Sequence, residues 1–176
     1  MMMKYDDLIE QEIKPIEMLE KLGIDFVRLT HEPANSMELC VGIGREQNAE
    51  HCKNLFLTNR SGNRFFLVMM DANKPYRTSD VSKKLGSSRL SFGSPDQLRE
   101  IMGLEPGSVS VLGLVNECAQ KAAAEGKLSA ALDRTLIERE NICVHPNVNT
   151  RTLVLKTADV LRFIERSGCP FQIIDI

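Results

Sequence analysis

The stretch KNLFLTNRSGNRFFLVMMD, residues 53–71, decides the fold of this chain, because it combines two apolar segments with a tight turn. Glycine and asparagine in the turn (RSGN, residues 60–63) favour a reversal of the chain, and the flanking phenylalanine, leucine and valine residues favour strands. The pattern therefore predicts a β-hairpin. Lys53 and Asn54 open the first strand, and the residues that follow them are mostly apolar.

Periodic segments on both sides of this hairpin predict helices and further strands. Helices are expected at residues 5–22, 36–41, 79–85, 94–102 and 157–167, and strands at 24–31, 88–92, 108–116, 142–146, 150–155 and 171–176. We expect Pro15 to interrupt the first helix and Gly23 to end it. Ser94 and Gln97 are placed to form a capping box, and Thr157 is placed to cap the last helix.

Residues 117–140 leave helix and strand open, because AQKAAAEG and DRTLIERE favour helix whereas LSAAL is compatible with a strand. The order of the other elements indicates a mixed α/β (α+β) protein with much antiparallel pairing. The chain shows no repeat, linker or low-complexity tract. We therefore expect a single domain over residues 1–176, with an N-terminal helical segment at 1–22.

Composition excludes several classes of protein. The 176 residues suit one domain with a sizeable core. No apolar run approaches the roughly 20 residues that span a bilayer, and the acidic N-terminus resembles neither a signal peptide nor a transit peptide. Five scattered cysteines without a C-x-x-C pair favour reduced thiols and a cytoplasmic location. Three histidines without an H-E-x-x-H arrangement predict no metal site.

Charge is unevenly distributed along the chain. Residues 1–50 carry 5 basic and 11 acidic side chains, whereas residues 53–89 carry 8 basic and 2 acidic ones, and residues 90–176 carry 9 and 11. A local basic block on an acidic chain suits a restricted contact with a polyanion. The alternative is a solvated hairpin and helix face. General DNA binding conflicts with the overall net charge of −2.

Motifs for covalent or nucleotide-dependent chemistry are missing from the sequence. It contains no G-x-S-x-G elbow, no Walker-type glycine loop and no G-x-G-x-x-G. Cys52 follows His51, but neighbours on a strand point to opposite faces. A covalent mechanism is therefore disfavoured.

Polar residues at expected strand ends and loops are the remaining candidates. Lys53 and Arg89 each lie at the start of a strand, where a solvated edge charge is the alternative reading. The loop at residues 105–108 (EPGS) can present backbone N–H groups to a ligand, although Pro-Gly more often serves a turn. In HPNVNT, residues 145–150, Pro146 ends a strand and keeps the His145 ring near the corner. His145 either faces a ligand there or caps the corner.

Four blocks occur in order along the chain: KNLFLTNRSGNRFFLV, SRLSFGSPDQL, LEPGSVSVLGLVN and HPNVNT. Together they resemble the free-standing prolyl-tRNA editing proteins of the YbaK/ProX-like family, on its alanyl-tRNA(Pro) deacylase-like branch. The resemblance runs from about residue 24 to the end of the sequence. It implies a mixed, barrel-like central sheet with flanking helices, and hydrolysis of the ester that joins a wrong amino acid to tRNA(Pro).

The resemblance also implies the site. Lys53 and Asn54 match the family's essential Lys-Asn pair, and His145 matches its His-Pro histidine, so these three are the expected catalytic residues. The expected substrate-binding residues are Arg89, which matches the arginine before Leu-Ser-Phe, and the five members of the G-x-x-x-P loop: Gly107, Ser108, Val109, Ser110 and Val111. Val111 stands where the family usually has proline, and the alanine-rich segment 117–127 also departs from the family pattern.

An aminoacyl ester is already activated, so orienting water and stabilising an oxyanion suffice for hydrolysis. We expect non-covalent water attack on aminoacylated tRNA, most of all Ala-tRNA(Pro), without cofactor or metal. Lys53 would supply charge near the ester or terminal phosphate, the Gly107 and Ser108 amides would hold the substrate, and His145 would position the terminal adenosine. The alternatives are a deacylase for cysteine or serine, or for another tRNA, and an inactive binding module. Docking on a synthetase stays open.

Overall fold

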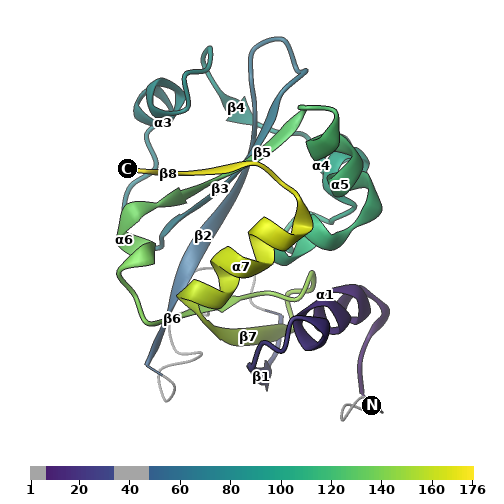
Figure 1. The fold of residues 1–176 in the computed structure, drawn as a ribbon. Helices are drawn as coiled ribbons and strands as arrows, with labels where there is room; N and C mark the ends of the chain where they lie inside the picture. The colour runs from purple at the N-terminus through teal and green to yellow at the C-terminus, as the bar shows by residue number, and fades with distance from the viewer. Residues whose placement is uncertain (1–6, 34–47) are drawn as a thin grey trace.

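The computed structural model describes residues 7–33 and 48–176. The described strands form one mixed sheet in the order β1-β7-β6-β2-β3-β5-β8, with β4 paired to β2 (Figure 1). The strands are β1 Val27–Thr30, β2 Ala49–Thr58, β3 Phe65–Asp71, β4 Ser91–Phe92, β5 Leu128–Asp133, β6 Asn141–Val144, β7 Arg151–Lys156 and β8 Phe171–Ile174. Helices flank this sheet, so the expected mixed α/β architecture is confirmed.

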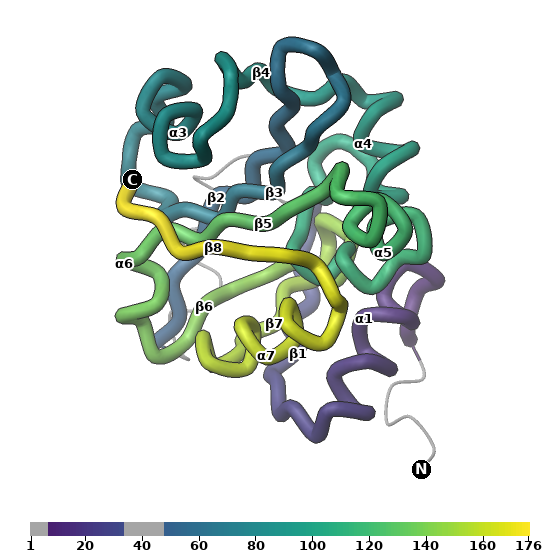
Figure 2. Tube along the Cα trace, turned by 45° about the horizontal axis from the view of Figure 1, so that its top comes forward, coloured from purple at the N-terminus to yellow at the C-terminus, as the bar shows by residue number. Residues whose placement is uncertain are grey.

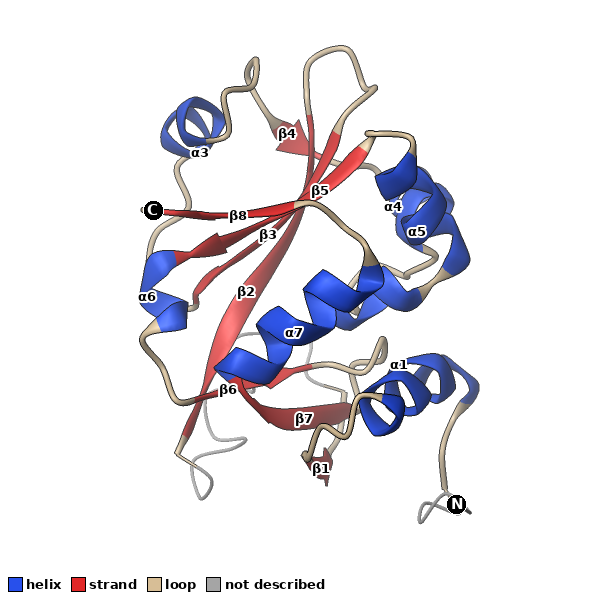
Figure 3. Ribbon diagram, in the orientation of Figure 1, coloured by secondary structure: helices blue, strands red, loops and turns tan. Residues whose placement is uncertain are grey.

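The hairpin predicted from residues 53–71 is present and lies at the centre of the sheet. β2 and β3 pair antiparallel from Cys52 opposite Asp71 to Thr58 opposite Phe65. Gly62 has a φ of +67° in the connecting turn, a conformation that glycine adopts without steric cost. The first residues of β2 pair in parallel with β6, so this long strand joins both halves of the sheet (Figure 3).

Helices cover the two faces of the sheet unequally. The main apolar core lies under α1 (Glu10–Lys21), α4 (Pro95–Met102), the 3-10 helix η2 (Val111–Val115), α5 (Glu117–Ala124), α6 (Arg134–Ile137) and α7 (Thr157–Ser167). The opposite face of β2 and β3 packs on α3 (Thr78–Lys84) through a smaller cluster that includes Leu57, Phe66 and Val81. Figures 1 and 2 show α3 apart from α4 and α5, with the hairpin between them.

Several local predictions are confirmed by their caps. The Ser94 hydroxyl oxygen accepts a hydrogen bond from the Gln97 amide, and the Gln97 side-chain oxygen accepts one from the Ser94 amide, which completes the expected capping box. Gly168 ends α7 with a φ of +77°. Gly23, with a φ of +63°, directly follows the last turn of α1.

Other local predictions are wrong. α1 continues through Pro15, which is buried, because its apolar face packs on the core despite the missing donor. Residues 108–116 form no strand: Ser110 caps η2, and Gly113 lies so close to Leu104 that a Cβ there would be 2.7 Å from its side chain. Thr157 is the first residue of α7 and not its cap, since Lys156 holds the N-cap position.

The ambiguous segment 117–140 resolves into α5, β5 and α6 in turn. The helix expected at residues 36–41 lies outside the described residues, as do residues 1–6. Within the described ranges, no helix is long and apolar enough to cross a membrane. The same residues contain no group of three or more side chains suited to hold a metal ion.

Candidate functional site

One stretch of β2 has no partner strand on one edge in the described part of the chain. On the edge away from β3, β2 pairs with β6 at residues 49–51 and with β4 at residues 57–58. Residues 52–55 lie between these pairings and include Lys53 and Asn54. β6 runs parallel to β2, so the chain leaves β6 at His145 beside this unpaired edge.

Lys53 and Asn54 point to opposite faces of the sheet, because side chains alternate along a strand. Asn54 lies opposite Met69 on the main-core face, and its amide nitrogen lies 3.8 Å from the Cys52 sulfur. Lys53 shares the α3 face with Leu55, and its ammonium donates to the carbonyl oxygen of Lys74. The structure therefore separates the expected Lys-Asn pair across the strand.

Asn54 carries a buried acceptor without a partner. Its side-chain oxygen Oδ1 is inaccessible to water and makes no hydrogen bond. Asn147, two residues after His145, has the same feature and is only 6% exposed. An unsatisfied buried acceptor costs free energy, so each of these two oxygens lacks a donor that buried amides ordinarily have.

His145 is held in one tautomer by its surroundings. Its Nδ1 lies 2.9 Å from the carbonyl oxygen of Arg151, which can only accept, so Nδ1 carries the proton in the neutral ring. Nε2 then remains as an acceptor. Burial lowers the pKa of His145, and the nearby His31 lowers it further, although the bond to Arg151 acts in the opposite direction. A neutral imidazole with a free lone pair is suited to accept a proton or a hydroxyl hydrogen bond.

His31 was missed by sequence reasoning. Its ring centre lies 6.3 Å from that of His145, and its Nε2 lies 2.9 Å from the hydroxyl of Thr152. The amide of His31 donates to the carbonyl of Thr150, which extends the pairing of β1 with β7. The available signal was that His31 and His145 each lie near the end of an expected strand, but their proximity depends on strand order.

The loop before η2 is built around a turn at residues 105–108. Pro106 and Gly107 occupy its central positions, and Gly107 has a φ of +86°, which a type II turn requires at that place. The Ser108 amide donates to the carbonyl of Glu105. The turn therefore uses the Ser108 amide within the chain. Gly107 lies beside Asn149: a Cβ atom at position 107 would be 3.9 Å from the side-chain nitrogen of Asn149.

Ser110 joins this loop to His145. Its hydroxyl donates to the carbonyl oxygen of His145 and accepts from the Leu112 amide at 3.1 Å, and its side chain is wholly buried. Val111, in the position of the family's proline, is also wholly buried as the first residue of η2. Val109 is half-buried against the main core. Ser110 and Val111 thus shape the loop from within.

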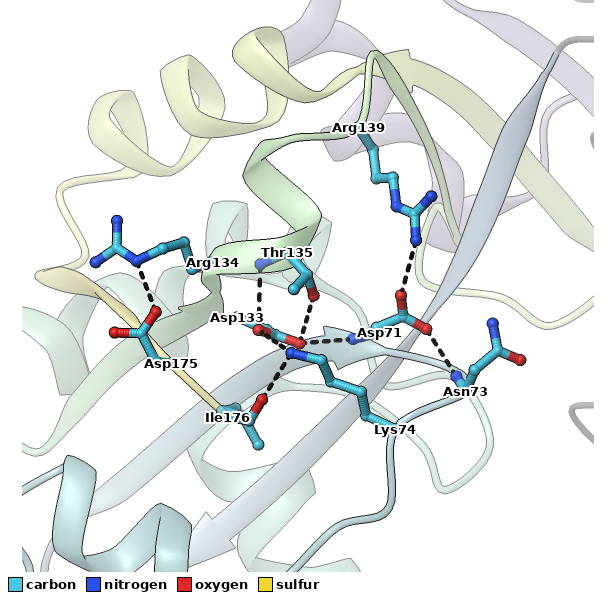
Figure 4. A network of polar contacts seen from close by, with 9 residues as sticks. All are labelled: Asp71, Asn73, Lys74, Asp133, Arg134, Thr135, Arg139, Asp175 and Ile176. Carbon is cyan, nitrogen blue, oxygen red and sulfur yellow. Dashed lines mark hydrogen bonds and ion pairs between the residues drawn. The ribbon is translucent and has the colours of Figure 1, made fainter.

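A polar network fixes the segment to which Lys53 is bonded (Figure 4). Asp133 is wholly buried and accepts from the Lys74 ammonium at 2.9 Å, from the Asp71 amide, and from the amide and hydroxyl of Thr135. The Lys74 ammonium also donates to the carbonyl oxygen of Ile176 at 2.6 Å. Burial alone would raise the pKa of Asp133, but the hydrogen bonds from Lys74 and Thr135 outweigh it and lower the pKa.

Arg89 belongs to the α3 face. It is exposed and lines a cavity of about 510 Å³ with Thr78, Ser79 and Ser82 of α3. The basic block at residues 53–89 folds as one unit of β2, β3 and α3, with Arg89 two residues before β4. Cys52 is unsuited to nucleophilic attack, because burial raises the pKa of its thiol to about 12.

Comparisons with known proteins define the class of this site. The chain matches the aminoacyl-tRNA editing domain over residues 31–163. It is 30% identical to the prolyl-tRNA editing protein ProX of Acetoanaerobium sticklandii, over 92% of this chain and 94% of that protein. It is 25% identical to the multifunctional Ser/Thr-tRNA deacylase ProXp-y of Escherichia coli K12, over 85% and 86% of the two chains.

A solved structure of a candidate trans-editing enzyme for prolyl-tRNA synthetase has the same fold. The two chains superpose with a TM-score of 0.71 over 97% of this chain and 99% of the other, at 14% sequence identity. The fold and the match thus define a class, the hydrolases that deacylate aminoacyl-tRNA. The chain belongs to the aminoacyl-tRNA editing domain family.

Proposed function

We propose that this protein is a trans-editing enzyme that hydrolyses the ester of mischarged tRNA(Pro), with Ala-tRNA(Pro) as its substrate. The likeness to a prolyl-tRNA editing protein supports the choice of tRNA. The observation that carries a catalytic role for this particular site is the pair of acceptors, Asn54 Oδ1 and His145 Nε2, at the unpaired edge of β2. In this proposal the whole chain, residues 1–176, acts as one editing domain.

The two faces of β2 divide the substrate between them. Lys53 and Arg89 lie on the basic α3 face, where they attract the phosphates of the acceptor end. Asn54 faces the main core, and His145 lies beside His31 next to the same open edge, so the aminoacyl ester and terminal ribose would be held between them. The 3′ end of the tRNA would therefore cross the open edge at residues 52–55.

Hydrolysis then needs few groups. His145 Nε2 accepts a hydrogen bond from the attacking water or from the terminal ribose hydroxyl, while its Nδ1 stays bonded to Arg151. Asn54 Oδ1 accepts from a donor of the ribose or of the aminoacyl group. In the loop before η2, the backbone amide of Gly107 would donate a hydrogen bond to the substrate. Water attacks the ester carbon, the C–O bond to the ribose breaks, and the free amino acid and tRNA leave.

Selectivity rests on size. A synthetase discriminates a methylene group by only about 10–200-fold, so small errors pass to a second, hydrolytic site. A pocket that admits alanine and excludes proline spares the correct product. Editing of serine on tRNA is the second candidate, because the chain resembles a Ser/Thr-tRNA deacylase over most of its length. Transient docking on a synthetase would supply such substrates directly.

A panel of mischarged tRNAs tests this function. Alanine, cysteine and serine on tRNA(Pro), and alanine on tRNA(Ala), are each incubated with the purified chain, and the remaining ester is measured over time. We expect Ala-tRNA(Pro) to be hydrolysed fastest and Pro-tRNA(Pro) to be spared. Faster hydrolysis of another ester would assign that ester as the substrate. If none is hydrolysed, the protein is a binding module and not a deacylase.

Lys53→Ala is the matched variant for this panel. We expect it to fold normally and to lose deacylation of Ala-tRNA(Pro), because the ammonium that meets the polyanion is gone. Lys83→Ala, an exposed lysine on α3, serves as the charge-matched control. Undiminished turnover by Lys53→Ala would remove Lys53 from the mechanism.

A further inference from the structure

An aromatic pair is exposed on the α3 face of the hairpin unit. Phe92 is 62% exposed, and Val27, at 44%, is the other exposed large apolar side chain among the described residues. Its ring centre lies 5.5 Å from that of Tyr76, and the two planes are tilted by 56°. Tyr76 is half-buried and packs on the smaller apolar cluster. The Tyr76 ring therefore supports the Phe92 ring from one side, while much of the Phe92 ring contacts solvent.

The backbone places this pair next to positive charge. Phe92 pairs with Leu57 across β2 and β4, so both side chains lie on the α3 face. Leu55 and Lys53 follow on the same face of β2, and Lys53 lies four residues, or about 13 Å, from Leu57. The Lys53 ammonium is bonded to Lys74, two residues before Tyr76. Aromatic rings and the ammonium thus form one strip.

Further cations surround the strip. Arg89 lies three residues before Phe92 and is exposed, as is Arg77 beside Tyr76. The guanidinium of Arg64 lies over the Phe66 ring, 5.4 Å from its centre, on the same face. The whole segment 53–89 carries 8 basic and 2 acidic side chains. Exposed rings among cations are the arrangement by which proteins bind unpaired nucleotides.

We propose that Phe92, supported by Tyr76, is a stacking platform for an unpaired nucleobase near the 3′ end of the tRNA. Every base has a π-face, so stacking needs no particular sequence, whereas Lys53 and the arginines meet the neighbouring phosphates. The platform would hold the strand on the α3 face so that its terminal ribose reaches the open edge of β2. This inference rests on the proposed function, because it assigns part of the same substrate.

Direct binding tests the platform without requiring catalysis. Uncharged tRNA(Pro), intact or trimmed of its unpaired 3′ nucleotides, is titrated at fixed salt against the wild type, Phe92→Leu and Phe92→Tyr. Leucine keeps the apolar volume but removes the π-face, and tyrosine keeps the ring. For intact tRNA we expect Phe92→Leu to bind about 5- to 150-fold more weakly, the range of one base–aromatic contact, and Phe92→Tyr to match the wild type. Trimmed tRNA should not distinguish the three proteins.

Two results would overturn the platform: Phe92→Leu binding intact tRNA as the wild type does, or losing affinity equally for both RNAs. Deacylation kinetics separate this proposal from the function on which it rests. If Phe92 is a stacking platform, the Phe92→Leu substitution raises the KM of deacylation and leaves kcat unchanged. If the wild type hydrolyses the ester and Phe92→Leu changes neither KM nor binding, the proposed function stands and the platform is rejected. If Phe92→Leu weakens binding but the wild type hydrolyses no ester, the platform stands and the proposed deacylase function is rejected.

Discussion

Lys53 and Asn54 are adjacent in β2, yet the Lys53 ammonium bonds to the carbonyl of Lys74 on the α3 face while the Asn54 amide lies beside the Cys52 sulfur on the main-core face. The two side chains therefore meet different parts of any ligand that crosses this strand. Lys53 has its hydrogen-bond partner in the folded chain, whereas the oxygen of Asn54 has none. Substitutions at the two positions should differ in their effects on stability.

Asn54→Ala should abolish or strongly reduce deacylation without destabilising the fold. The substitution removes a buried oxygen that makes no hydrogen bond, so the free energy of unfolding should stay unchanged or rise by up to about 1 kcal/mol. Urea unfolding and single-turnover deacylation measure the two quantities on the same preparation. A clear loss of stability together with normal turnover would mean that the amide has a structural role.

Ser110→Ala should reduce both stability and turnover. Its hydroxyl makes two buried hydrogen bonds, to the His145 carbonyl and from the Leu112 amide, and leaving these groups without partners costs about 1–3 kcal/mol. The loop at His145 loses a tether, so kcat should fall. Ser129→Ala in β5, a half-buried serine, is the control and should change stability by less than about 0.5 kcal/mol. Equal behaviour of the two variants would argue against the tether.

The pH dependence should follow His145. Burial and the nearby His31 hold its pKa below the ordinary value of 6.5. Between the lowered folded-state pKa and 6.5, the unfolded chain binds more protons, so the free energy of unfolding rises with pH across that window. Deacylation should also rise with pH through the lowered pKa as Nε2 loses its proton.

His145→Asn is the variant that checks this assignment. Urea unfolding between pH 5 and pH 8, compared with the wild type, should show a smaller rise of stability in the variant. In the variant, the kcat/KM of the remaining deacylation should no longer rise with pH at the acidic end of this range. An identical stability profile for both proteins would assign the titration to another group.

Lys74→Met should weaken the network that positions the carbonyl bonded to Lys53. Asp133 stays buried but loses its cationic donor, which should cost about 1–3 kcal/mol at neutral pH. The pKa of Asp133 is lowered in the fold, so its contribution is present above the unfolded value of 3.8 and is lost as pH falls through the folded value. In Lys74→Met the pKa of Asp133 is lowered less, so acid unfolding should begin at a higher pH than in the wild type.

Acid titration followed by circular dichroism measures that shift, with Lys83→Met as the control. Lys83 is exposed on α3, so its substitution should leave the acid midpoint where it is in the wild type. Matching midpoints for Lys74→Met and the wild type would show that the amide and hydroxyl donors suffice for Asp133. In that case Lys74 would matter only through its backbone carbonyl.

Local patterns predicted much of the secondary structure, because each depends on neighbours in the chain. The hairpin of β2 and β3 and the capping box of α4 are such cases. Segment 108–116 failed for a physical reason: its alternating valines suit a strand, but contacts with Leu104 and the cap at Ser110 select a 3-10 helix. Propensity is a weak guide where tertiary packing decides.

The sequence alone determined a mixed α/β chain, a basic block at residues 53–89 and the candidate residues Lys53, Asn54 and His145. Only the tertiary structure decided how they are combined. The packing of α3 and of the main core decided what Lys53 and Asn54 each contact, and the order of strands brought His31 beside His145. The physical reason is that composition and periodicity act over a few residues, whereas the pairing of strands distant in sequence sets which side chains share a face.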